Sequence, residues 1–329
     1  MHKVNLSPTL LSRRVKERLG GQKSISSRIY GATTQSHWRY LFTMHTISLD
    51  IEKDVWKMDY TLDLNQPYPI SQKEIDIFKK QGFVKLKQVL SPTTLEYYGR
   101  LISQEVKRLS MDSKPMSERT TYEKAFLQVM NLWTFNDEVK EFCFGKKLAR
   151  IAAELMQVKG VRLYHDQALY KEPSGGFTPW HADKYYWPVE GDDMCTVWIP
   201  LQATPMEMGP LAFSSGSHQF AYGRDLEISD QSEATLQKAL EDNGFPHRSG
   251  AFDLGEVSFH SGWTFHHAGP NLTNNARAVM TMIYMRDGSR LTEPTNENQR
   301  NDWNTWMPGT EIGKPVQTHL NPVLYRDEG

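Results

Sequence analysis

Residues 178–187 read TPWHADKYYW and place a histidine, His181, two positions before an aspartate, Asp183. Side chains alternate between the two faces of a β-strand, so residues i and i+2 point the same way. If this stretch is a strand, an imidazole nitrogen and a carboxylate oxygen can reach one metal ion. A His-x-Asp pair occurs by chance in many sequences, so its interpretation depends on the segments that accompany it.

A second histidine for such an ion is available in FHSGWTFHHAGPN, residues 259–271. This segment contains His260, His266 and His267, and adjacent strand residues face opposite ways, so only one of the last two can point at an ion. Two histidines and one carboxylate leave coordination positions open, which is typical of non-haem Fe(II) oxygenases. A zinc hydrolase can use the same kind of ligand set with an activated water.

The composition excludes several classes of protein. The chain has 329 residues, 39% hydrophobic and 11% aromatic, which allows one large domain or two ordinary ones with a sizeable core. A formal net charge of −1 indicates no general attraction to nucleic acid or anionic lipid. No apolar run approaches the ~20 residues of a membrane-spanning helix. Cys143 and Cys195 are predicted to be buried, reduced thiols of an intracellular protein.

Residues 1–44 differ from the rest of the chain. They are basic and rich in Ser and Thr, and Glu17 is their only acidic residue. This pattern is typical of an organellar transit peptide, which would give a mitochondrial location. The alternative is that translation starts at Met44, and a cytoplasmic location is then expected. Either way, we predict a basic, disordered leader over 1–44 and a single domain over 45–329.

Helical signals come first in the body of the chain. Ser71-x-x-Glu74 is a capping box that predicts a helix to about Lys80, ended by Gly82. Ser91 followed by proline predicts a second helix start, and apolar residues at helical spacing continue it to residue 109. A third apolar stripe covers residues 146–156. These helices are expected to flank a sheet.

Beyond Gly160 the pattern changes to short strands separated by Gly and Pro turns. Strands are predicted at 83–86, at 161–170, around His181, and at 196–201, 209–213, near 251, 257–259, 264–266 and 277–285. Asp230-x-x-Glu233 predicts the cap of one inserted helix. The tail from Gly288 is expected to pack over the core, because it contains Trp303 and Trp306. This order predicts a mainly β fold with flanking helices, a sandwich or a jelly-roll barrel.

Six motifs in this order, followed by Arg277, resemble those of the phytanoyl-CoA dioxygenase family. They are LYHDQALYKEP at 163–173, TPWHAD at 178–183, WIPL at 198–201, MGPL at 208–211, GSH at 216–218 and HHAGPN at 266–271. The resemblance covers roughly residue 70 to the C-terminus. It implies a double-stranded β-helix (jelly-roll, cupin-like) core and an Fe(II)- and 2-oxoglutarate-dependent dioxygenase. Such an enzyme uses O2 to hydroxylate an unactivated carbon of a small organic substrate and releases succinate and CO2, with ascorbate as a candidate reductant.

The resemblance also implies which residues act. In the family the second histidine ligand lies five positions before the asparagine of the next turn, here Asn271, which selects His266 over His267. The implied metal ligands are therefore His181, Asp183 and His266, with His260 as the remaining competitor. Arg277 is implied as the cation that binds the far carboxylate of 2-oxoglutarate, and a hairpin is expected to return it beside the strand of His266.

Further cosubstrate contacts are implied for Gln128, Gln167 and Trp198, each of which has an ordinary role in the core as its alternative. Ala268 stands where the family often has a serine, so one hydrogen bond to the cosubstrate is expected to be missing. Related halogenases replace the carboxylate ligand with a small residue, and the presence of Asp183 therefore favours hydroxylation.

Other polar residues near the motifs have structural interpretations. His165 and Asp166 diverge on a strand and are expected to be structural, and His218 is predicted in a turn. Residues 185–187 either line the substrate pocket or pack in the core. The alternative function is a catalytically silent jelly-roll protein that binds a small molecule or a partner. No protein or nucleic-acid partner is predicted, and no basic run suits a CoA phosphate.

Overall fold

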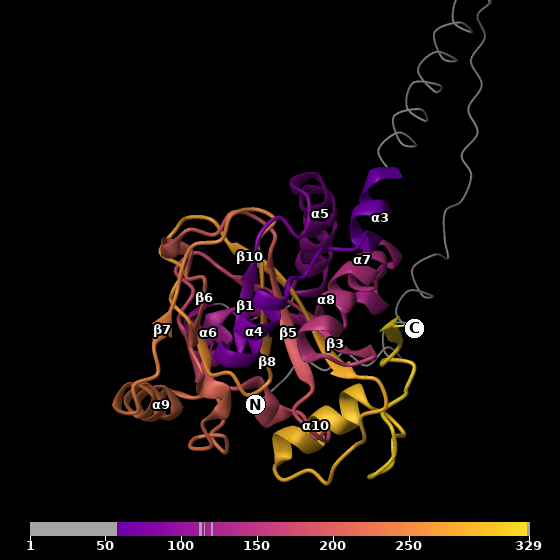
Figure 1. Cartoon of the computed structure of the whole chain (residues 1–329). Coiled ribbons are helices and arrows are strands. Elements are labelled where there is room, and N and C mark those ends of the chain that lie inside the picture. Colours follow the sequence, from indigo (N-terminus) through magenta and orange to yellow (C-terminus); the bar gives the residue numbers. More distant parts are fainter. Residues whose placement is uncertain (1–57, 112–113, 115, 120, 328–329) are drawn as a thin grey trace, which may run out of the picture. The chain divides into compact units, whose positions relative to one another are not determined.

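Two antiparallel β-sheets form the frame of the protein (Figure 1). The structure is a computed structural model and describes residues 58–327 except 112, 113, 115 and 120. The larger sheet has the order β1-β8-β5-β10-β3-β11, with β2 also paired to β3, and the smaller sheet has the order β4-β9-β6-β7. This arrangement confirms the predicted β fold with flanking helices.

The strands are short except for β3 and β10 of the larger sheet, with 12 and 10 residues. Those of the larger sheet are β1 (Phe83–Leu86), β2 (Leu127–Met130), β3 (Gly160–Lys171), β5 (Met194–Pro200), β8 (Val257–Ser261), β10 (Arg277–Arg286) and β11 (Val323–Arg326). Those of the smaller sheet are β4 (Thr178–His181), β6 (Leu211–Ser214), β7 (His247–Arg248) and β9 (His266–Ala268).

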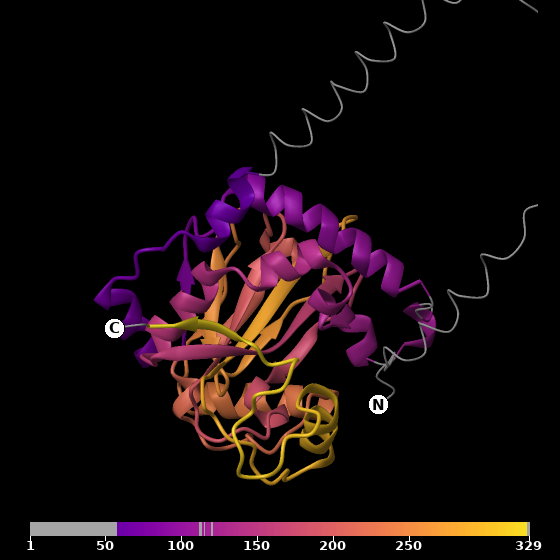
Figure 2. The ribbon, with the colours of Figure 1, turned by 90° about the vertical axis from the view of Figure 1, so that its right-hand side faces the viewer.

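Most helices lie on one side of the larger sheet, as Figure 2 shows. The α-helices are α3 (Met58–Asn65), α4 (Gln72–Gln81), α5 (Pro92–Leu109), α6 (Thr121–Ala125), α7 (Asp137–Cys143), α8 (Lys146–Met156), α9 (Asp230–Asp242) and α10 (Glu297–Trp306). The described part of the chain also has five short 3-10 helices: η1 (Met116–Glu118), η2 (Leu132–Thr134), η3 (Asp183–Tyr186), η4 (Met206–Met208) and η5 (Ser217–Gln219).

The two faces of the larger sheet have different chemistry. On the outer face, Val197, Phe259 and Met282 are fully buried in the main core together with apolar side chains of α4, α5, α7 and α8. The inner face is more polar. Strand pairing aligns Ser258, Trp198, Thr281 and Gln167 in one row across β8, β5, β10 and β3. A buried sheet with one polar face indicates that this face lines a site.

The predicted helix starts and stops are confirmed by their caps. Ser71 and Glu74 form the reciprocal capping box of α4, and Gly82 ends the helix with a left-handed φ of 80°. The side chain of Ser91 accepts a hydrogen bond from the backbone N–H of Thr94 at the start of α5. These local signals were readable because each depends only on neighbouring residues.

The predicted cap of α9 was wrong by one residue. Ser229 is the N-cap and exchanges hydrogen bonds with Ser232. Glu233 instead accepts a hydrogen bond from the backbone N–H of Trp180, at 2.5 Å, so it ties the helix to the His181 strand. The Glu233 carboxylate therefore makes a contact with a residue far away in the sequence, which the local capping pattern could not predict.

Some predicted strands were displaced. The strand predicted at 264–266 is β9 and begins only at His266, and residue 252 makes an isolated bridge with Thr204 in place of a strand near 251. The C-terminal tail packs over the core as predicted, because Trp306 is buried and Met307 is completely so. The sequence analysis missed α3, α6, α7, α10, β2, β7 and β11.

Cys143 and Cys195 are both free and buried, as predicted. Across the described part of the chain, no helix has the length and apolarity needed to span a membrane. The described residues all fall within one compact unit. The predicted leader at 1–44 lies outside them, and so does the start of the predicted domain.

Candidate metal and cosubstrate site

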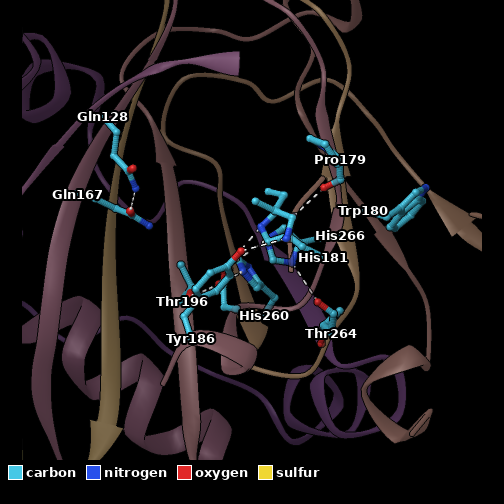
Figure 3. A network of polar contacts seen from close by, with 12 residues as sticks. Gln128, Gln167, Pro179, Trp180, His181, Tyr186, Thr196, His260, Thr264 and His266 are labelled. Atoms are coloured by element: carbon cyan, nitrogen blue, oxygen red, sulfur yellow. Dashed lines mark hydrogen bonds and ion pairs between the residues drawn. The ribbon is translucent and has the colours of Figure 1, made fainter. Parts of the chain in front are cut away.

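His181, Asp183 and His266 meet at one point. His181 ends β4 and His266 begins β9, and the two residues are directly paired in the sheet register. Their ring centroids are 4.1 Å apart, and each Nε2 lies 3.7 Å from Oδ1 of Asp183. One potential ligand atom from each residue lies within 4.8 Å of the others. Figure 3 shows the two imidazoles side by side.

His181 and Asp183 do not share a strand, contrary to the prediction. Asp183 does not lie on the strand of His181, because β4 ends at His181 and Asp183 is the first residue of η3. The intervening Ala182 keeps an extended backbone, with φ −121° and ψ 130°. The expected same-side geometry of residues i and i+2 therefore holds across Ala182, and the chain turns only afterwards.

Backbone carbonyls fix the orientation of both imidazoles. Nδ1 of His181 lies 2.8 Å from the carbonyl oxygen of Pro179, and Nδ1 of His266 lies 2.9 Å from that of Thr264. A carbonyl can only accept, so each Nδ1 carries the proton and each Nε2 presents a lone pair. Metal-binding histidines are commonly held in this way, and both free nitrogens face Asp183.

Burial and neighbouring charges set the protonation states of these residues. Burial lowers the pKa of His181 to about 4, and the nearby His266 acts in the same direction. The pKa of His266 is also lowered to about 4, mainly by burial. For Asp183, burial favours the neutral acid, but His266 and the hydrogen bond from His260 outweigh it and hold the pKa well below its usual range. Two neutral imidazoles and one carboxylate fit a divalent cation.

His260 and His267 occupy different positions from the candidate triad. His260 lies behind Asp183, with Nε2 at 3.1 Å from Oδ2, and is not one of the three grouped residues. His267 faces the other way, as strand alternation predicts. Its Nε2 lies 2.9 Å from Nε2 of His247, and its ring stacks on Trp180 at 4.1 Å. The choice of His266 over both neighbours therefore agrees with the geometry.

Arg277 begins β10 and points into the protein, with 2% of the residue exposed. Its Nη1 donates to the carbonyl oxygen of Gly209, and its guanidinium lies over the ring of Trp198, 5.5 Å from the centroid. Burial lowers its pKa to about 9, so it stays charged at neutral pH. Within the described residues, Nε has no hydrogen-bond partner and no carboxylate pairs with the guanidinium. A buried cation without a counter-ion fits an anionic ligand.

The predicted hairpin between His266 and Arg277 was wrong. β9 belongs to the smaller sheet and β10 to the larger one, so the chain crosses between sheets after Ala268. Asn271 stabilises this crossing: its Nδ2 donates to the carbonyl oxygens of Lys171, Glu172 and Asn275. The crossing places Arg277 opposite Lys171 of β3, at the end of the larger sheet's inner face.

Lys171 is a second buried basic residue near Arg277 and was not among the predicted site residues. Its Nζ donates to the carbonyl oxygens of Gly176, at 2.6 Å, and Gly269, at 2.8 Å. Burial lowers its pKa to about 6, and the charge of Arg277 acts in the same direction. A lysine in the motif LYKEP gives no local sign of burial. The contacts show that it joins the loop after β3 to the end of β9.

The three further cosubstrate candidates lie on the inner face of the larger sheet. Nε2 of Gln128 donates to Oε1 of Gln167 at 2.6 Å, so these two side chains bind each other (Figure 3). Trp198 packs in a cluster with Leu211, Phe213 and Val279, and it also contacts Arg277. The structure thus brings Trp198 beside Arg277 and joins Gln128 to Gln167. Ala268 is buried at the end of β9.

Two of the residues expected to be structural, Asp166 and His218, contact backbone groups away from the triad. Asp166 is fully buried and accepts hydrogen bonds from the backbone N–H groups of Leu132 and Trp133, on the outer side of β3. His218 lies in η5, with Nε2 at 3.0 Å from the carbonyl oxygen of Lys79.

The aromatic residues after the triad, at 185–187, contact neighbouring segments of the chain. Trp187 belongs to a buried cluster with Tyr164 and Trp306. The hydroxyl of Tyr186 accepts from the backbone N–H of Ile228, at 3.1 Å. The backbone carbonyl of Tyr185 accepts from Gln299 of α10, at 3.0 Å, so the missed helix α10 covers η3.

The fold and the site together define a class, the Fe(II)- and 2-oxoglutarate-dependent oxygenases with a double-stranded β-helix core. The sequence pattern of the phytanoyl-CoA dioxygenase family (PhyH) matches residues 78–279. The chain belongs to this family.

Individual relatives agree with this assignment. A probable alpha-ketoglutarate-dependent hypophosphite dioxygenase of Stutzerimonas stutzeri is 23% identical over 219 residues, which cover 62% of this chain and 74% of the relative. The carbocyclase SnoK from nogalamycin biosynthesis has a TM-score of 0.65 and 22% identity, with 79% of this chain and 99% of SnoK covered. The epimerase SnoN has a TM-score of 0.63 and 21% identity, with 77% and 98% covered, and was solved with Fe3+, alpha-ketoglutarate and nogalamycin RO. These structures share the fold of this chain.

Proposed function

We propose that the protein is a hydroxylase that holds Fe(II) through Nε2 of His181, a carboxylate oxygen of Asp183 and Nε2 of His266. The observation that carries the proposal is the convergence of these side chains from β4, η3 and β9 within 4.8 Å, with both Nδ1 atoms already engaged. Two imidazoles and one carboxylate leave room on the metal for a cosubstrate and O2.

We assign 2-oxoglutarate to the space between the triad and Arg277. The guanidinium is the buried cation that would bind the far carboxylate, since it can donate two parallel hydrogen bonds and is pre-oriented by Gly209 and Trp198. Gln167 and Gln128 are the candidates for further polar contacts. When bound, iron and 2-oxoglutarate supply the activation of O2, while the protein positions the reactants and excludes water.

The substrate is placed on the β2 and β3 side of the triad. On the opposite side, Phe83 stacks on Phe213 with ring centroids 4.2 Å apart, and this aromatic cluster fills the space between the sheets. The β3 side carries the Gln128–Gln167 pair and Thr281 on the inner face. A small organic molecule with both polar and apolar groups suits such a surface.

Hydroxylation is the reaction that the residues favour, because a carboxylate stands at position 183 where related halogenases have a small residue. The relatives SnoK and SnoN are described as a carbocyclase and an epimerase, so product analysis is required. A hydroxylase product gains one oxygen atom. A cyclised product loses two hydrogens, and an epimerised product keeps the mass of the substrate.

The test uses the purified protein with Fe(II), 2-oxoglutarate, ascorbate and O2, and measures succinate. We expect slow succinate release even without substrate, and its loss in Asp183→Ala and in His266→Ala. His267→Ala is the matched control, because His267 is next to His266 but faces away, and it should keep the wild-type rate. Undiminished turnover in either triad variant contradicts the assignment, and no succinate from the wild type favours a silent binding protein or a zinc hydrolase.

A further inference from the structure

Two donors from the larger sheet hold the outer oxygen of Asp183. The hydroxyl of Thr196 donates to Oδ2 at 2.8 Å, and Nε2 of His260 lies 3.1 Å from the same oxygen. Thr196 and His260 are direct partners across β5 and β8, so the sheet fixes their spacing. The candidate metal ligands come from other elements, namely β4, η3 and β9.

These contacts give the two oxygens of the Asp183 carboxylate different surroundings. Oδ2 is engaged by the two donors, whereas Oδ1 faces Nε2 of both His181 and His266 at 3.7 Å. An ionised carboxylate has about four lone-pair positions, and two on Oδ2 are already taken. The oxygen left for a cation is therefore Oδ1, and the carboxylate is held for coordination through one oxygen.

The same geometry shows which nitrogen of His260 donates to Asp183. Because an ionised Asp183 can only accept, Nε2 of His260 must carry the proton. Nδ1 of His260 has no hydrogen-bond partner among the residues that the structure describes. The ring is fixed by packing, with Phe213 at 5.5 Å and His266 at 4.5 Å between centroids, and the His260 side chain is only 2% exposed. The imidazole has one directed contact, and that contact is Asp183.

We propose that His260 and Thr196 are positioning residues that keep Asp183 a one-oxygen ligand. If Oδ2 were free, the carboxylate could rotate and coordinate through both oxygens, which would occupy a position needed by 2-oxoglutarate or O2. The two hydrogen bonds also hold Oδ1 toward Nε2 of His181 and of His266, so less ordering of the carboxylate is needed when a metal binds. This inference rests on the proposed iron site. The sequence alone left His260 as an alternative metal ligand, and the inference gives it a different role.

The test compares pairs of variants that separate shape from hydrogen bonding. His260→Phe keeps a flat ring but loses the donor, while His260→Gln can restore an N–H near the position of Nε2. Thr196→Val keeps the shape without the hydroxyl, and Thr196→Ser keeps the hydroxyl. The controls are Thr204→Val, a buried threonine whose hydroxyl donates to the carbonyl oxygen of Gln202, and His319→Phe, on the surface. Metal-free thermal unfolding shows whether each variant folds.

Two quantities are measured without oxygen: the affinity for Co(II) by calorimetry, and the visible charge-transfer band of Fe(II) with 2-oxoglutarate. Hydrogen-bond partners of metal ligands typically contribute about 10- to 100-fold in metal affinity. We expect a loss of that size and a shifted band in His260→Phe and Thr196→Val. His260→Gln and Thr196→Ser should recover most of both, and the controls should match the wild type.

The outcomes separate this inference from the proposed function. Wild-type metal affinity and an unshifted band in both His260→Phe and Thr196→Val overturn the positioning role while leaving the iron site intact. A wild type that binds neither metal nor 2-oxoglutarate overturns both. If His260→Phe does not fold, the Thr196 pair decides the question, because valine and threonine have nearly the same shape.

Discussion

Replacing Arg277 with methionine should weaken 2-oxoglutarate binding by roughly 30- to 3,000-fold. The guanidinium is almost completely buried, and no carboxylate of the described residues neutralises it. Removing one partner of a buried, hydrogen-bonded charge pair costs about 2–5 kcal/mol, because the other charge is left unpaired. Each 1.4 kcal/mol is about a factor of ten in affinity, which gives the stated range.

The measurement is an anaerobic titration of the Fe(II)-loaded protein with 2-oxoglutarate, followed by the charge-transfer band. Arg277→Lys should fall between wild type and Arg277→Met, since lysine keeps the charge but lacks the planar fork. Arg108→Met removes an exposed arginine of α5 and serves as the control. If Arg277→Met binds 2-oxoglutarate within about threefold of the wild type, the assignment of this residue is refuted.

Three further predictions concern the frame around the site. Gly191→Ala should cost ~1–2 kcal/mol of unfolding free energy, because residue 191 has a left-handed backbone but open space around it. Gly209→Ala should cost clearly more, because a Cβ at residue 209 also overlaps the carbonyl oxygen of Gly269. Denaturant unfolding of both variants checks this. Phe259→Ala should cost about 3–5 kcal/mol of unfolding free energy, since Phe259 is fully buried on the outer face of the larger sheet. The same method measures it, and a variant as stable as the wild type would contradict the prediction. Burial raises the pKa of Asp166 from 3.8 to about 7, against the backbone hydrogen bonds from Leu132 and Trp133. Protonation then favours the folded state, so this group lowers stability as pH rises from about 4 to 7, and Asp166→Asn should remove that part of the pH dependence of unfolding.

Local patterns and the family resemblance predicted His181, Asp183 and His266 as one group, and the structure brings these three side chains together. The His-x-Asp spacing brings His181 and Asp183 to one side because Ala182 stays extended, even though the strand ends at His181, two residues before Asp183. Strand alternation separates His266 from His267 correctly. The helix caps at Ser71 and Ser91 were readable because they are interactions between near neighbours.

The remaining features depend on long-range pairing that no local motif encodes. The crossing from β9 to β10 connects two different sheets, so a turn signal between them was misread as a hairpin. Lys171 is buried by the loop after β3 and by the end of β9, and its sequence neighbours indicate neither. Thr196 and His260 acquire their contact with Asp183 only when the larger sheet packs against η3.

A crystal structure of the protein grown without oxygen, with Mn(II) in place of iron and with 2-oxoglutarate, tests the central claim most directly. We predict one metal ion bound by Nε2 of His181, one oxygen of Asp183 and Nε2 of His266, with the far carboxylate of 2-oxoglutarate on Arg277. Metal bound at other residues, or 2-oxoglutarate that leaves Arg277 without an anion, would contradict it.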